Sequence, residues 1–249
     1  RERELTIEER IIAVDDGDTP AEGLLVVDGR YAGRRPGILV CHTIRGRTRF
    51  EDDKARNLAA MGYAALTVDL YGLDTRDNTI DELREHMNAW RSDRPALQAR
   101  LKHWLDVIRR QPEVNAASIA AIGFCFGGLC VLDLARSGAD IAGVVSFHGL
   151  FDAPGNTSGN RIRARVLALH GWDDPLATPE AVNALATELT AQGADWQIHA
   201  YGNTLHAFTN PAASDKGAGT VYNAKADRRS QAAMQDFFTE LFGRQAVSE

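Results

Sequence analysis

Apolar and polar positions alternate along the chain in blocks of two kinds. Short apolar runs, typical of buried strands, are followed by longer segments in which apolar residues recur every three or four positions, as on one helix face. The pattern predicts strands at 37–41, 63–70, 118–124, 141–147, 165–170 and 196–201. It predicts helices at 50–61, along one long region up to Pro112, and at 127–137, 179–192 and 226–242.

This alternation of strands and helices predicts an α/β fold, a doubly wound and mostly parallel sheet with helices on both faces. No repeat, linker or low-complexity segment interrupts 1–249, so we expect one domain. In such sheets, sites form where the strands end at their carboxyl ends. Candidate chemistry is therefore sought at those positions.

Composition and charge narrow the class of protein. The 249 residues carry a net charge of -6 with no long basic run, so we expect no nucleic-acid partner. No apolar stretch is long enough to cross a bilayer, and the charged start at Arg1 lacks the apolar core of a signal peptide. Three cysteines are a small and odd number, which does not fit a disulfide framework. We expect a cytoplasmic protein without membrane association.

One strand end carries the pattern of a nucleophile elbow. The strand 118–124 runs into Gly123-Phe-Cys-Phe-Gly127, Gly128 follows, and a helical segment begins. A sharp strand-to-helix turn leaves no room for large neighbours, and Gly123 and Gly127 meet that demand. The turn places Cys125 at a helix start, where the dipole favours a thiolate and backbone N–H groups can hold an oxyanion.

The elbow requires an acid and then a histidine at later strand ends. Asp173 and Asp174 follow the strand 165–170, and His206 follows the strand 196–201. His206 would take the proton of Cys125, while one aspartate would orient the imidazole. The pattern leaves open which of the two aspartates does so. No ligand spacing or glycine-rich phosphate loop is present, so we predict no metal and no cofactor.

The remaining cysteines, and most of the other residues that could carry chemistry, are expected to have structural roles. Cys41 and Cys130 lie in or beside apolar segments and are predicted to be inert packing. Trp104 lies on the apolar face of the long helical region and is predicted to be core, whereas Trp90 stays open. Three further histidines also end strands, and we expect each to be structural or at the rim of a site: His42, His148 and His170.

The motifs Gly123-Phe-Cys-Phe-Gly-Gly128, His170-Gly-Trp-Asp-Asp-Pro175 and His206-Ala-Phe208 together resemble the dienelactone hydrolase (carboxymethylenebutenolidase) family of the α/β-hydrolase superfamily, over about 37–242. The resemblance implies an α/β-hydrolase fold and a Cys-Asp-His triad. Because the family's acid directly precedes a proline or its equivalent, the resemblance selects Asp174. It also places oxyanion donors on the backbone N–H groups of Phe126 and Ile44.

Two positions depart from the family. Lactone-cleaving members carry a glutamate in the first active-site loop, where this chain has Thr43, and an arginine after the histidine, where it has Asn210. Arg45, Arg47 and Arg49 could supply the missing positive charge for an acidic substrate, although a solvated basic loop is the favoured interpretation. Thr43, Arg45 and Asn210 are the candidate substrate-binding residues.

The predicted function is hydrolysis of a small-molecule ester or lactone through a thioester on Cys125. The first alternative is a ligand-binding or sensor protein that has kept the fold without turnover. The second alternative is thiol redox chemistry at Cys125, since an activated thiolate is also oxidisable.

Overall fold

The computed structural model describes residues 6–15 and 19–248 and contains two compact units. We call the described parts of Arg1–Ala121 and Phe242–Glu249 the N-terminal unit, and Ile122–Leu241 the C-terminal unit. The boundary falls inside strand β5 (Val114–Phe124), so both units share that strand. That the whole chain is one domain stays a prediction.

In the N-terminal unit the strands follow the order β1-β2-β4-β3-β5. The first two, β1 (Ile7–Asp15) and β2 (Pro20–Asp28), form an antiparallel ladder from the pair Ile7 and Asp28 to the pair Asp15 and Pro20. β2 pairs antiparallel with β4 (Ala64–Thr67), and β4 pairs parallel with β3 (Arg35–Cys41). The hydrophobic pattern did not predict β1, because it is a mostly exposed edge strand without a sustained apolar run. β2 was also missed, although it is mostly buried and contains the apolar run 24–27.

In the C-terminal unit the order continues from β5 through β6 (Gly143–Phe147), β7 (Arg165–Gly171) and β8 (Trp196–Tyr201). The last three strands pair parallel, with Val144 opposite Val166 and Val166 opposite Trp196. Their carboxyl ends therefore lie along one edge, where the predicted acid and histidine follow β7 and β8. Two short strands come after His206, β9 (Ser214–Asp215) and β10 (Thr220–Val221).

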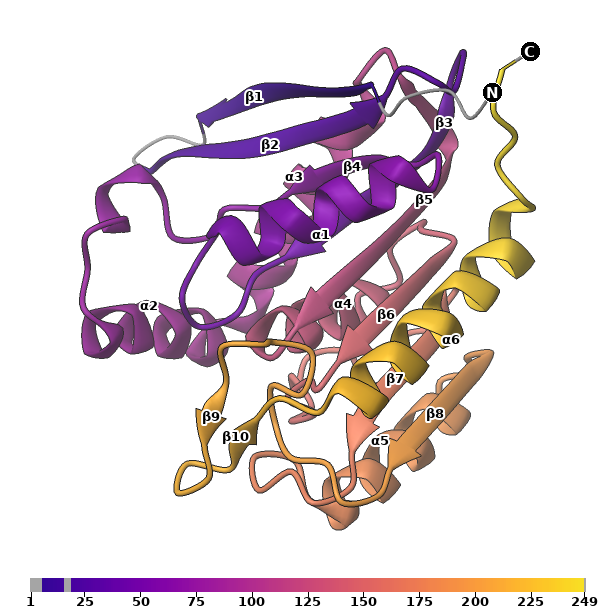
Figure 1. Cartoon of the computed structure of the whole chain (residues 1–249). Helices are drawn as coiled ribbons and strands as arrows, with labels where there is room; N and C mark the ends of the chain where they lie inside the picture. The colour runs from indigo at the N-terminus through magenta and orange to yellow at the C-terminus, as the bar shows by residue number, and fades with distance from the viewer. Residues whose placement is uncertain (1–5, 16–18, 249) are drawn as a thin grey trace. The chain divides into compact units, whose positions relative to one another are not determined.

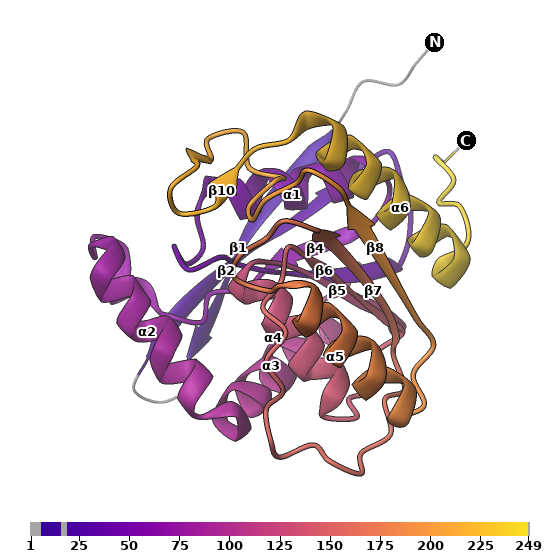
Figure 2. The same cartoon turned by 90° about the horizontal axis from the view of Figure 1, so that it is seen from below.

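Helices cover both faces of the strands in each unit (Figures 1 and 2). In the N-terminal unit these are α1 (Arg49–Ala60) and α3 (Arg94–Arg109). In the C-terminal unit, α4 (Phe126–Arg136) and α5 (Pro179–Ala191) lie on one side of β6 to β8, and α6 (Ala224–Phe242) lies on the other. The predicted mostly parallel sheet with helices on both faces is confirmed.

The long helical region is two helices, which corrects the single-region prediction. The 3-10 turn η1 (Leu73–Thr75) precedes α2 (Ile80–Ser92), and the helical structure is interrupted at Asp93 before α3 begins. The break has a local cause, because the Asp93 side chain accepts a hydrogen bond from Ala96 N (3.1 Å) and Pro95 occupies the first turn of α3. Trp104 on α3 is fully buried, so its prediction as core is confirmed.

A buried ion cluster joins α4 to α5. The Arg136 side chain is fully buried, and its guanidinium lies 3.2 Å from Asp133 Oδ1 and 2.8 Å from Glu188 Oε1. It also donates to Phe151 O (3.0 Å), in the loop after β6. Because a buried charge is tolerated only when it is paired and hydrogen-bonded, this cluster fixes the last turn of α4 against its neighbours.

Candidate active site

The chain turns sharply at Cys125, between the end of β5 and the start of α4. Cys125 has φ 57°, a left-handed conformation that costs a residue with a side chain about 1–3 kcal/mol. Its N–H donates to Phe147 O on β6 (3.0 Å), and its carbonyl accepts from Gly128 N (2.9 Å). A Cβ added at Gly123 would lie 1.9 Å from Gly127 O, so the turn requires glycine at that position.

Asp174 and His206 meet at the carboxyl ends of β7 and β8. His206 Nδ1 donates to Asp174 Oδ2 at 2.7 Å, and both side chains are almost fully buried. The other carboxylate oxygen, Oδ1, accepts from Leu176 N (2.8 Å), which fixes the carboxylate plane. Asp173 is exposed. Of the two aspartates that the pattern left open, Asp174 is the one that contacts the histidine.

The loop that carries His206 is held by backbone and amide contacts. His206 N donates to Gly219 O (2.9 Å), and His206 O accepts from Val221 N (3.1 Å), so the loop is tied to the β10 segment. Ahead of the histidine, Asn223 Nδ2 donates to Thr204 Oγ1 (3.2 Å), and Thr204 O accepts from Asp173 N (3.0 Å). The acid loop and the histidine loop are therefore joined directly.

The charge state of His206 is set by its two partners. Burial lowers the pKa of His206, but Cys125 and the Asp174 carboxylate together outweigh burial and raise it to about 10. Nε2 of His206 is buried and hydrogen-bonds to no oxygen or nitrogen of the described residues.

The first loop of the N-terminal unit follows β3. Thr43 N donates to Glu51 Oε1 (3.3 Å), and Thr43 Oγ1 accepts from Arg45 N (3.2 Å). Burial raises the pKa of the Glu51 carboxyl. His42 is locked in one neutral tautomer, since Nδ1 donates to Thr43 O (2.7 Å) and Nε2 accepts from Leu70 N (3.1 Å). His42 is thus structural, and it shapes the backbone just before Ile44.

Ile44 belongs to the N-terminal unit and Phe126, the first residue of α4, to the C-terminal unit. Their predicted pairing as oxyanion donors stays a prediction. Asn210 is half-buried and turns inward on its own chain, where its Oδ1 accepts from Ala212 N (3.0 Å).

Three comparisons bear on identity. The model of the dienelactone hydrolase family matches residues 23–242. A solved structure named m3DLH is 40% identical with a TM-score of 0.90, over 95% of this chain and 99% of that one. The chain belongs to the dienelactone hydrolase family. A dienelactone hydrolase-like promiscuous phosphotriesterase from metagenomic libraries is 38% identical with a TM-score of 0.89, over 96% of this chain and all of that one.

A protein of Caenorhabditis elegans without an assigned function is 34% identical over 149 residues, 59% of this chain and 94% of its own. The predicted resemblance and the α/β-hydrolase fold are both confirmed, and family membership makes this protein a hydrolase of the ester or lactone class. In the described residues, none of the helices combines the length and apolarity that a membrane span needs.

The first-loop arginines of this dienelactone hydrolase family member differ in their environments. Arg47 makes two hydrogen bonds to the Asp52 carboxylate (2.9 and 3.0 Å), and Arg49 lies 3.4 Å from Asp53. Arg45 is exposed. A cavity of about 260 Å³ in the N-terminal unit is lined by Arg45, Gly46, Arg47, Thr48, Asp69, Gly72, Thr75 and Arg76.

Buried histidines surround the acid and the base of the C-terminal unit. His170 Nε2 donates to Ala177 O (2.7 Å) and lies 4.0 Å from Asp174 Oδ2, and burial lowers the pKa of His170. His148 is 1% exposed, and its ring meets that of His206 edge-on. Of the two expected positions, structural or at the rim of a site, both histidines take the structural one, because each packs inside the unit. Sequence reasoning did not find the contact between His148 and His206; histidines at successive strand ends were the available signal.

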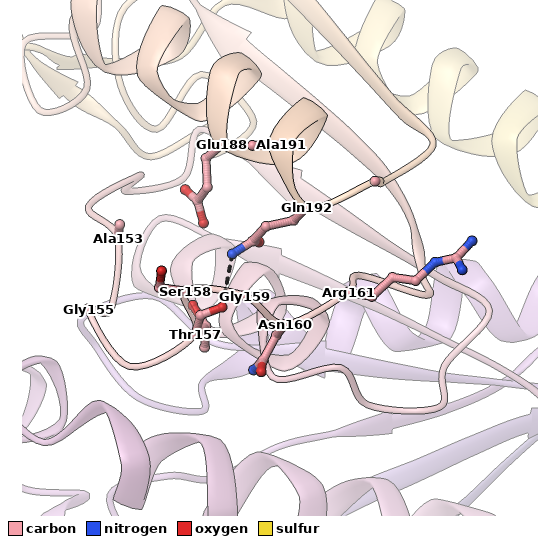
Figure 3. Close-up of a pocket in the computed structure, with 11 residues that line it drawn as sticks. Ala153, Gly155, Thr157, Ser158, Gly159, Asn160, Arg161, Glu188, Ala191 and Gln192 are labelled. Carbon is pink, nitrogen blue, oxygen red and sulfur yellow. Dashed lines mark hydrogen bonds between the residues drawn. The ribbon is translucent and has the colours of Figure 1, made fainter.

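Cys41 and Cys130 are fully buried, and burial raises the pKa of Cys41 to about 12, as expected of inert thiols. Trp90 is half-exposed, and its Nε1 donates to Leu70 O (3.0 Å). A cavity of about 590 Å³ lies between the loop after β6 and the end of α5 (Figure 3). There Gln192 Nε2 donates to Thr157 O at 3.1 Å, and none of the predicted site residues lines the cavity.

We expect Gly123→Ala to destroy the turn at Cys125. The added methyl would overlap the Gly127 carbonyl at 1.9 Å, and backbone on both sides leaves no room to move. Ester hydrolysis should fall at least 100-fold, as expected when reacting groups are displaced by about 1 Å. Gly202→Ala is the matched control, since its Cβ meets nothing within 4 Å. Equal activities in the two variants, measured with p-nitrophenyl butyrate, would contradict this account of the turn.

Proposed function

We propose that this protein hydrolyses a small-molecule ester or lactone with Cys125 as nucleophile, His206 as base and acid, and Asp174 as the residue that orients His206. The observation that carries the proposal is the buried hydrogen bond of 2.7 Å between His206 and Asp174, with the Cys125 thiolate acting on the same imidazole. An imidazolium held by a carboxylate on one side and a thiolate on the other is ready to give its proton to a leaving group.

In the first half-reaction the Cys125 sulfur attacks the carbonyl carbon, and the carbonyl oxygen becomes an oxyanion. When that intermediate collapses, the carbon–oxygen bond to the alcohol breaks and His206 Nε2–H protonates the leaving alkoxide. The product is a thioester on Cys125 and a neutral imidazole. For a lactone, the alcohol stays joined to the acyl group.

In the second half-reaction His206 takes a proton from water, and the resulting hydroxide equivalent attacks the thioester carbon. Collapse expels the Cys125 thiolate and releases the acid, which restores the ion pair. Asp174 stabilises the imidazolium each time it forms, without itself taking the proton. The buried position of the Asp174–His206 pair strengthens this interaction because water does not screen it.

The oxyanion is assigned to the backbone N–H groups of Phe126 and Ile44. Phe126 is the first residue of α4, so its N–H lies at the positive end of the helix dipole. The substrate contacts are assigned to Thr43, Arg45 and Asn210. Arg45 is exposed and lines a cavity, which supports a role with an acidic substrate group, whereas Asn210 is engaged in a local turn.

The two alternative functions make different demands. A ligand-binding protein without turnover has no need of a thiolate and an imidazolium. Thiol redox chemistry needs an activated thiol but does not need Asp174 to orient His206. The 2.7 Å bond therefore favours hydrolysis, and location in the cytoplasm remains part of the proposal.

The first test measures thiol activation and turnover together. At pH 7 the rate of Cys125 alkylation by iodoacetamide should fall about 30-fold in His206→Gln, since an ordinary thiol with a pKa of about 8.5 is about 3% ionised there. Above a pH of about 10, where His206 loses its proton, the ion pair should be lost in the wild type. Hydrolysis of p-nitrophenyl butyrate should vanish in both His206→Gln and Cys125→Ala. Cys41 and Cys130 are buried internal controls for alkylation; activity surviving in Cys125→Ala would reject the nucleophile.

The second test separates the two aspartates. Asp174→Asn should lower kcat by about 10⁴-fold, because the amide cannot stabilise the imidazolium and favours the wrong tautomer. Asp173→Asn, at an exposed neighbouring position, should change kcat less than threefold. Initial rates with p-nitrophenyl butyrate would measure both, and the opposite ranking would reassign the acid.

A second candidate activity is favoured by the 38% identity to a promiscuous phosphotriesterase. The same thiolate could attack phosphorus, form a sulfur–phosphorus bond and expel an aryloxide. Incubation with diethyl p-nitrophenyl phosphate should then release p-nitrophenol in at least one equivalent per protein, and Cys125→Ala should release none. Wild-type protein that releases p-nitrophenol no faster than Cys125→Ala would remove phosphotriesters from its substrates.

A further inference from the structure

His148 occupies the space between the elbow and the base. It directly follows β6, and its N–H donates to Leu169 O on β7 (2.9 Å). The preceding residue, Phe147, supplies the carbonyl that accepts from Cys125 N (3.0 Å). The His148 side chain is 1% exposed, and its ring lies edge-on to the His206 ring, with centroids 5.2 Å apart and planes at 68°.

The same ring contacts the neighbours of both reactive residues. It lies edge-on to Phe208, two residues after His206, with centroids 5.1 Å apart, and 6.0 Å from the ring of Phe124, which precedes Cys125. His148 is therefore packed against the strand that ends at the nucleophile and against the loop that carries the base. A movement of its ring would be transmitted to both.

The orientation of the His148 ring is fixed by Thr209. Nε2 of His148 and Oγ1 of Thr209 form a hydrogen bond of 2.9 Å, and Thr209 is fully buried. The backbone of His148 has φ 38°, a left-handed conformation that a residue with a side chain keeps only when its surroundings hold it there. Such conformations gather at functional sites.

We propose that His148 is a positioning residue for His206, with Thr209 as its anchor. Asp174 fixes the rotation of the His206 imidazole through Nδ1 and so maintains the resting pair with the thiol, whereas the His148 ring fixes the tilt of the imidazole plane, so that Nε2 meets first the leaving alkoxide and then the attacking water. This inference rests on the proposed role of His206.

A double-mutant cycle tests the proposal on the full-length protein. Thr209→Val keeps the shape of the side chain and removes the hydroxyl, whereas Thr209→Ser keeps the hydroxyl. We expect Thr209→Val to lower kcat for p-nitrophenyl butyrate about tenfold with KM within twofold, and Thr209→Ser to stay within twofold of wild type. His148→Phe, which keeps a ring without the hydrogen bond, should show a similar loss. In that background Thr209→Val should have no further effect, because Thr209 acts through His148.

Two controls separate position from stability and from failure of the whole mechanism. Thr209→Val should retain the wild-type rate of Cys125 alkylation at pH 7, which a general loss of structure would not leave intact. His199→Ala removes a half-exposed histidine on β8 and should match wild type. Additive losses in the cycle, or unchanged kcat in Thr209→Val, would overturn the role of His148. Wild-type protein that hydrolyses no ester would instead reject the proposed function, and this inference with it.

Discussion

The close approach of Gly123 to Gly127 is the constraint on which the C-terminal unit depends. A strand can pass into a helix at Cys125 only because the carbonyl of one glycine lies where the Cβ of the other would be. Gly128 and Gly149 are under a similar steric constraint, because a Cβ added at either position would overlap Ser146 Oγ. The cysteine consequently takes a strained conformation, held by its hydrogen bonds to β6 and to α4. The position of the Cys125 thiol therefore depends on the close packing of the backbone around it.

Burial and charge act against each other around this turn, and the outcome differs from group to group. His206 is buried, yet its carboxylate and thiolate partners raise its pKa. His170 is buried beside the same carboxylate, but it donates to a backbone carbonyl and its pKa is lowered. The difference lies in distance, 2.7 Å from Asp174 in one case and 4.0 Å in the other. Cys125 also raises the pKa of His206 and does not act on His170, so the short carboxylate contact and Cys125 together overcome desolvation at His206 alone.

Much of the fold could be predicted from the sequence because buried parallel strands are continuous apolar runs bounded by turn residues. The strands β3, β4, β6 and β7 and the second half of β5 were of this kind, whereas β8 is only partly buried. The pattern did not predict β1, because an exposed edge strand has no such run. It did not predict the interruption at Asp93 either, because the apolar spacing of α2 continues into α3 and the cap at Asp93 acts within a single turn. The chain order of Cys125, Asp174 and His206 was readable, since each follows a strand. The orientation of side chains could not be predicted from the sequence. For that reason the spacing alone did not select Asp174 over its neighbour, and the contact between His148 and His206 was not predicted.

Arg136 has a consequence for the helix that begins just after Cys125. α4 has 11 residues and is therefore about 16 Å long, with Cys125 at one end and Arg136 at the other. The bonds from Arg136 to Asp133, Glu188 and Phe151 hold that far end to α5 and to the loop after β6. α4 is therefore held at both ends, because Cys125 N donates to Phe147 O on β6 (3.0 Å) where the helix begins. A loss of the Arg136 contacts would thus free the far end of the same helix that carries Cys125 at its start.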